Sequence, residues 1–259
     1  MIGAIAGDII GSVHERAGTK TKRFPLFSPY SRFTDDTVLT VAVADVLLNG
    51  GDYVDRFHDY FHAYPQAGYG GSFIRWASQR RRAPYGSWGN GSAMRVCPVG
   101  IACDTLDQVM AEAERSAAVT HDHPEGVRGA QATAAAVFLA RTGHDRDAIR
   151  THLERTFGYD LSTPLDAIRD GYTFDVSCQG SVPQAIRAFL ESTDYEDAVR
   201  NAISLGGDAD TMACIAGGIA EAFYRGVPAD IHDPVLALLD DRLPPVVEAF
   251  TTRFGDRLR

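Results

Sequence analysis

The chain has 259 residues, of which 45% are hydrophobic and 23% charged, and its formal net charge at pH 7 is −9. This composition is typical of a soluble globular protein and excludes a disordered chain. The negative charge, without a basic stripe, disfavours duplex nucleic acid or an anionic membrane as the principal partner.

No linker rich in proline or serine divides the sequence, so we expect a single domain over residues 1–259. Asp8 interrupts the first apolar stretch and no basic segment precedes it, so it does not resemble a signal peptide. The longest apolar run is too short to span a membrane. The four cysteines have no CxxC spacing, which favours buried free thiols in a reducing compartment. These features predict a cytoplasmic protein, and we expect a monomer.

Helical periodicity dominates the chain and strand alternation is almost absent, which predicts an all-α protein. Gly/Pro-bearing segments at 16–33, 64–72, 83–92, 157–181 and 226–232 are expected to be connections. The predicted helices span residues 2–14, 37–49, 52–63, 106–119, 126–142, 145–156, 183–192, 195–205, 211–225, 233–241 and 244–254.

Small residues recur at helical spacing in three of these helices, so the helices can approach one another closely. They are Gly3, Gly7 and Gly11, then Gly129, Ala132, Ala136 and Ala140, then Ala213, Gly217 and Ala220. The first helix also carries a polar stripe, formed by Asp8, Ser12 and Glu15. This stripe either faces solvent or contributes to a site.

Two acidic clusters, TDDT at residues 34–37 and DADT at residues 208–211, each stand directly before an apolar helix. One such cluster alone would be read as helix capping. Two clusters with the same Asp-Thr pattern favour shared ligation of a hard divalent cation, because adjacent buried carboxylates repel one another unless a cation neutralises them.

The glycine-rich segment 84–95 places three glycines around Trp88 and Asn90. Its exposed backbone N–H groups could hold an anion beside a large aromatic ring. The alternative is a surface turn with a core tryptophan. His121, just before the helix expected near Glu125, is either a ligand contact or a residue at the helix start, because no partner suited to zinc accompanies it.

Taken together, these motifs resemble the ADP-ribosylglycohydrolase family, and the resemblance spans nearly the whole chain. It rests on Gly7-Asp8 with Glu15, on residues 34–37, on residues 89–95, on Thr120-His121, and on residues 206–211. The family implies a compact all-α orthogonal bundle and a two-metal hydrolase. The implied ligands of two Mg²⁺ or Mn²⁺ ions are Thr34, Asp35, Asp36, Asp208, Asp210 and Thr211. The implied substrate-binding residues are Gly86, Ser87, Trp88, Gly89, Asn90, Gly91 and His121.

By the same resemblance, the reaction is cleavage of the bond between ADP-ribose and an acceptor, which is either O-linked (serine or O-acetyl) or N-linked (arginine). Glu15 and Asp35 are the catalytic candidates, with Glu15 as general base or acid. The Asp8-to-Glu15 spacing and residues 89–95 look more like the O-linkage branch. Two alternatives remain open: a non-catalytic ADP-ribose-binding protein of the same fold, and a two-metal phosphohydrolase.

Overall fold

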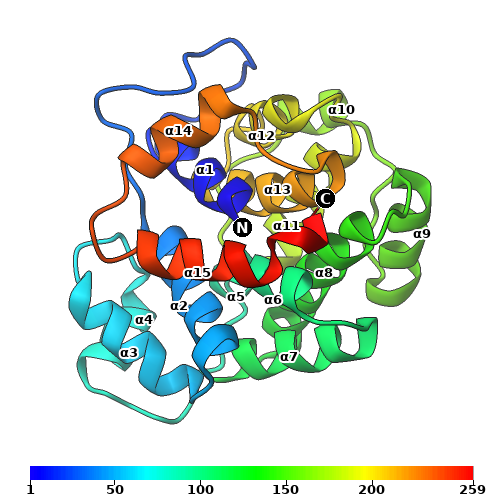
Figure 1. Ribbon diagram of the computed structural model, residues 1–259. Coiled ribbons are helices and arrows are strands. Elements are labelled where there is room, and N and C mark those ends of the chain that lie inside the picture. Colours follow the sequence, from blue (N-terminus) through cyan, green and yellow to red (C-terminus); the bar gives the residue numbers. More distant parts are fainter. Residues whose placement is uncertain (259) are drawn as a thin grey trace.

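The computed structural model describes residues 1–258, and within them the regular structure is helical apart from one isolated bridge between Gly89 and Ser177 (Figure 1). The predicted all-α class is therefore confirmed. The α-helices are α1 (Ile2–Gly11), α2 (Asp35–Asn49), α3 (Tyr53–Ala63), α4 (Gly71–Ser78), α5 (Gly91–Met94), α6 (Cys97–Ala102), α7 (Leu106–Ala118), α8 (Pro124–Arg141), α9 (Arg146–Phe157), α10 (Leu165–Arg169), α11 (Cys178–Leu190), α12 (Tyr195–Ile203), α13 (Ala209–Tyr224), α14 (Ala229–Ala237) and α15 (Pro244–Phe254). A short 3₁₀ helix, η1 (Gly255–Leu258), follows.

The centre of the fold is the pair α1 and α13, which lie side by side although about 200 residues separate them in sequence (Figure 1). Their backbones touch because α1 presents glycines to α13. A Cβ added at Gly3 would lie 2.5 Å from the carbonyl oxygen of Gly217, and one added at Gly7 would lie 2.0 Å from that of Ala213. The close approach predicted from the small residues is confirmed for this pair.

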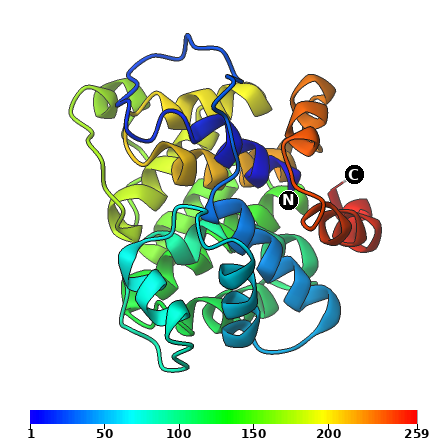
Figure 2. The same ribbon diagram turned by 90° about the vertical axis from the view of Figure 1, so that its left-hand side faces the viewer.

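The other helices surround this pair and share one hydrophobic core. Helices α8, α11 and α12 pack against α13, whereas α2 contacts α1, α3, α6 and α15. In Figure 2, α14 and α15 lie together at one side of the molecule. No helix among the described residues is long and apolar enough to cross a membrane.

Several helix boundaries differ from the expected ones. Helix α1 ends at Gly11, because backbone hydrogen bonds from His14 to Gly11 and from Ala17 to His14 turn the chain into a series of tight turns. Helices α4, α6 and α10, each at most 8 residues long, were not predicted. They are too short to show several repeats of the helical pattern.

Candidate active site

A cavity of about 400 Å³ lies where the starts of α2 and α13 meet the segments that follow α1 and that precede α4, α5, α8 and α11. Most of its polar lining residues fall into an acidic group and a glycine-rich group. The acidic group comprises Glu15, Asp35, Asp36, Asp208 and Asp210, with Thr34 and Thr211 beside them. The glycine-rich group comprises Gly89, Asn90 and Gly91 with Ser87 and His121, and a second glycine-rich stretch runs from Gln66 to Phe73. The cavity therefore brings together most of the residues selected from the sequence.

Asp8, on α1, is completely buried and organises the first acidic cluster. Its carboxylate accepts four hydrogen bonds, from the backbone N–H and the hydroxyl of Thr34 and from the same two groups of Thr37. These bonds hold the loop before α2 against α1. Asp8 was part of the sequence stripe but not of the expected ligand set, and the solvent-facing reading of that stripe is wrong for Asp8 and Ser12, which are both buried.

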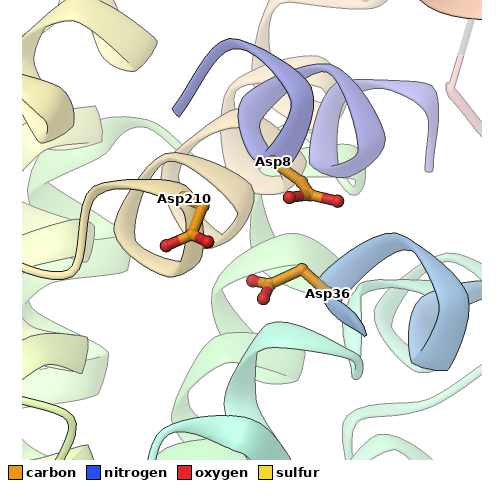
Figure 3. A group of neighbouring side chains, drawn as sticks. All are labelled: Asp8, Asp36 and Asp210. Atoms are coloured by element: carbon orange, nitrogen blue, oxygen red, sulfur yellow. The ribbon is translucent and has the colours of Figure 1, made fainter. Parts of the chain in front are cut away.

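Three carboxylates from distant parts of the chain converge on one point. Asp8, Asp36 and Asp210 each place an oxygen so that the three oxygens lie within 4.8 Å of one another, and Figure 3 shows them facing a common space. Oδ1 of Asp36 is buried and has no hydrogen-bond partner among the described residues. The hydroxyl of Thr211 approaches Oδ2 of Asp36 at 3.4 Å. An unpartnered buried oxygen in such a cluster is suited to a cation.

The other two aspartates of the clusters flank this group. The backbone N–H of Asp35 donates to the carbonyl of Ala67 at 2.8 Å, so the partly exposed Asp35 lies against the second glycine-rich stretch. Asp208 is buried and accepts a hydrogen bond from the side-chain amide of Asn90 at 2.7 Å. Asn90 thereby connects the glycine-rich loop to the acidic cluster before α13.

Burial and mutual repulsion disfavour the charged form of these acids. Burial, and next the charge of Asp210, raise the pKa of Asp8 from 3.8 to about 7. The same two causes, in the same order, raise the pKa values of Asp35, Asp36 and Asp208 well above 3.8. A divalent cation would favour their ionised forms, and carboxylate and hydroxyl oxygens are the donors that Mg²⁺ and Mn²⁺ prefer. The residues present therefore fit a hard divalent cation.

Glu15 lies in the turns after α1, which ends at Gly11, so the expectation that the first helix carries Glu15 is wrong. Its half-buried side chain still lines the cavity. Burial, followed by the charge of Asp210, raises the pKa of Glu15. Later in the same connection, Lys20 donates hydrogen bonds to the carbonyls of Arg169, Tyr172 and Leu205, which fastens the connection to the rest of the fold.

The first glycine-rich loop is held by backbone hydrogen bonds to residues 174–178. The N–H of Asn90 donates to the carbonyl of Val176 at 2.7 Å, and the N–H of Cys178 donates to that of Trp88 at 2.8 Å. Ser87, Gly89, Asn90 and Gly91 line the cavity, whereas Gly86 and Trp88 do not. Trp88 is 53% exposed, so the alternative of a core tryptophan is wrong.

His121 is buried against this loop and lines the cavity. Sequence reasoning did not identify several other lining residues: the stretch 66–73, Phe174, Val176 and the role of Asp8. Three glycines between residues 68 and 71 were an available signal for the stretch. Nothing in the local pattern of Phe174 or Val176 marks them as lining residues.

The family model described as ADP-ribosylglycohydrolase matches residues 1–258. The ADP-ribosylhydrolase ARH3 of Mus musculus is 30% identical, with 86% of this chain and 82% of that protein covered. The ADP-ribosylarginine hydrolase Tri1 of Pseudomonas putida (strain GB-1) is 26% identical, with 99% and 81% covered. A solved ADP-ribosylglycohydrolase-related protein complex is similar with a TM-score of 0.68 and 25% identity, covering 98% of this chain and 97% of that chain.

Proposed function

This chain belongs to the ADP-ribosylglycohydrolase family, and on that premise we propose that it hydrolyses the glycosidic bond between ADP-ribose and an acceptor. The observation that carries the proposal is the composition of the cavity. Its acidic group can act on the ribose and on the glycosidic bond to be broken. Its glycine-rich group can bind the phosphate groups of a nucleotide.

Two divalent cations, Mg²⁺ or Mn²⁺, are part of the proposal. Thr34, Asp35, Asp36, Asp208, Asp210 and Thr211 would hold them. When bound, the cations supply charge for orienting sugar hydroxyls and lower the pKa of a water molecule. Asp8 would act behind the ligands, because its oxygens already accept the hydrogen bonds of Thr34 and Thr37 and so keep the Thr34 hydroxyl and Asp36 in place.

Glu15 is the proposed residue for proton transfer. Cleavage at the ribosyl carbon needs a group that takes a proton from water or gives one to the leaving oxygen or nitrogen. A carboxyl whose pKa is raised toward neutrality can do either at physiological pH. Glu15 combines a raised pKa with access to the cavity, whereas Asp36 and Asp208 are buried among the proposed ligands. Asp35 is partly exposed and is the second catalytic candidate.

The glycine-rich loop is the proposed pyrophosphate site. Side chains are absent at Gly89 and Gly91, so phosphate oxygens can approach the backbone, and α5 begins there. Trp88 stands at the outer side of this loop with half of its surface exposed, where it could contact an adenine that extends out of the cavity.

Product analysis tests the proposal. The purified protein with MgCl₂ or MnCl₂ is incubated with peptides that carry ADP-ribose on serine or on arginine, and with O-acetyl-ADP-ribose. Release of intact ADP-ribose, abolished by a chelator, is the expected result, with the O-linked substrates preferred on the resemblance of residues 89–95. Formation of AMP would instead favour pyrophosphate cleavage, and tight binding without any product would favour a binding protein.

A further inference from the structure

A chain of polar side chains runs beneath the glycine-rich loop, from Arg95 through Thr120 to His121. Arg95 is completely buried, and its guanidinium lies 4.4 Å from the ring centroid of Phe57. Its Nη2 donates to the carbonyl of Ser116 and to Oγ1 of Thr120, both at 2.9 Å. Oγ1 of Thr120 in turn lies 2.8 Å from Nδ1 of His121. No acidic side chain takes part in these contacts.

The direction of each hydrogen bond follows from what each group can donate. A guanidinium has no acceptor, so the Thr120 oxygen accepts from Arg95. The single hydroxyl proton of Thr120 then has two neighbours that can receive it, Nδ1 of His121 and the phenol oxygen of Tyr85. A neutral imidazole nitrogen is a far stronger base than a neutral phenol oxygen, so the proton is donated to Nδ1. The proton of a neutral His121 ring is therefore on Nε2.

The Nε2 atom faces the glycine-rich loop. A Cβ added at Gly91 would lie 3.3 Å from Nε2, and one added at Gly89 would lie 3.6 Å from it. Within residues 1–258, Nε2 has no hydrogen-bond partner, and the ring lines the cavity. Burial, and then the charge of Arg95, lower the pKa of His121 well below its ordinary value, so the ring is neutral and keeps one N–H.

We propose that Arg95 and Thr120 are positioning residues that hold His121 as the Nε2–H tautomer, so that it donates a hydrogen bond to a phosphate oxygen of the substrate. The identity of the ligand rests on the proposed function, whereas the tautomer does not. A phosphate oxygen suits this donor because it only accepts hydrogen bonds and because the neighbouring loop leaves room for it at Gly89 and Gly91. Nε and Nη1 of Arg95 are buried without a hydrogen-bond partner among the described residues, and the positive charge beneath the loop favours an anion further.

Thr120→Val and Thr120→Ser test the proposal with two measurements. Two-bond ¹H–¹⁵N spectra of histidine-labelled protein report which ring nitrogen carries the proton, with His121→Asn to assign the signal. Calorimetric titration with ADP-ribose in MgCl₂ reports affinity. Thr120→Val is expected to lose the pure Nε2–H form and to bind ADP-ribose about tenfold more weakly, the loss typical of one hydrogen bond to a charged group. Thr120→Ser keeps the hydroxyl and should retain both properties.

Thr133→Val is the matched control, because Thr133 is a buried threonine of α8 whose hydroxyl has no partner among the described residues. It should leave the spectrum and the affinity unchanged. Tyr85→Phe removes the competing acceptor and should keep the Nε2–H form, which keeps the tautomer testable if Thr120→Val does not fold. A wild-type ring protonated on Nδ1, or a folded Thr120→Val with wild-type spectrum and affinity, overturns the proposal. Failure of the wild-type protein to bind ADP-ribose overturns the proposed function instead, and the spectra still decide the tautomer.

Discussion

Glu15 is held less firmly in the cavity than the buried aspartates Asp8 and Asp208. Within the described part of the chain its carboxylate forms no hydrogen bond or ion pair, whereas Asp8 accepts four hydrogen bonds and Asp208 accepts one from Asn90. Arg16 and Arg32 act on it only through their more distant charges. A carboxyl that is free to rotate, partly exposed and raised in pKa can approach substrate or water, which the fixed aspartates cannot do.

Glu15→Gln should therefore lose most turnover while retaining fold and ligand binding. The amide keeps the shape of the side chain but cannot transfer a proton at neutral pH, so the rate should fall by about 10²–10⁴-fold. Steady-state release of ADP-ribose gives the rate, and calorimetric titration with ADP-ribose gives the affinity.

Glu114→Gln is the control for this variant, because Glu114 is exposed on α7, outside the lining of the cavity. It should match the wild-type protein in both measurements. Full turnover by Glu15→Gln would remove Glu15 from proton transfer and leave Asp35 as the candidate.

Single residues were predictable from the sequence where a local pattern marks them. The clusters 34–37 and 208–211 carry paired acids before a helix, and all four of these acids line the cavity. Asp8 was not selected as part of the centre, because a lone acid on an apolar helix gives no sign of the four hydrogen bonds it accepts from residues 34 and 37. Such partners come from tertiary packing, which spacing along one helix does not encode.

At the scale of elements, the contact between α1 and α13 sets the distance between Asp8 and Asp210. Gly7 precedes Asp8 and faces the backbone of α13 at Ala213. Alanine is a better helix former than glycine by about 1 kcal/mol, so Gly7→Ala would stabilise an isolated α1. In the folded protein the added Cβ would lie 2.0 Å from the carbonyl oxygen of Ala213, which requires the two helices to separate.

Gly7→Ala should accordingly destabilise the protein by about 1–3 kcal/mol or more, the usual cost of overpacking, and should weaken metal binding as the carboxylates move apart. Urea denaturation measures the first effect, and calorimetric titration with MnCl₂ measures the second. Gly171→Ala is the control, since nothing lies within 4 Å of a Cβ at that position. Equal stability of the two variants would contradict the tight contact.

The starts of two helices show why helix boundaries are only partly predictable from the sequence. The helices expected at residues 183–192 and 233–241 begin at Pro183 and one residue before Pro234, and proline is favourable in the first turn of a helix. Both prolines instead lie inside α11 and α14. In α11 the start is at Cys178, because the Ser177 hydroxyl caps the N–H of Gly180 at 3.1 Å. A cap several residues upstream thus outweighs the proline signal.

At the scale of the whole molecule, the acidic centre links stability to pH in the absence of metal. For Asp8 the folded-state pKa, about 7, is above the ordinary value of 3.8, and Asp35, Asp36 and Asp208 shift in the same direction. The folded protein then binds more protons than the unfolded chain between these values, so its stability falls as pH rises through this window and increases as pH is lowered.

Chelated protein should therefore be more stable near pH 5.5 than near pH 7, by about 2 kcal/mol for one group titrating across that interval. Saturating Mg²⁺ or Mn²⁺ should raise stability at pH 7 and reverse the trend, because the cation binds the ionised acids. Urea denaturation at both pH values, with and without metal, measures this. Asp36→Asn should reduce the change in stability with pH in the chelated protein. Asp147→Asn, on the exposed face of α9, should leave that change as in the wild-type protein. A chelated wild-type protein that loses stability steadily on acidification would refute this linkage.

The overall class was predictable because long amphipathic and buried helices give a strong periodic signal over most of the chain, as in α2, α8 and α13. The arrangement of the cavity could not be predicted from the sequence. Its walls include irregular segments such as residues 66–70 and 174–176, whose positions depend on distant helices.

Helix α1 has a consequence for the order of events during synthesis. Every one of its residues is buried in the finished protein, yet its main partner, α13, begins about 200 residues later. During synthesis α1 therefore forms long before its main packing surface, and only α2, which begins at Asp35, can contact it early. Its apolar residues stay incompletely covered until α13 has been made, and such transiently exposed apolar surface favours aggregation.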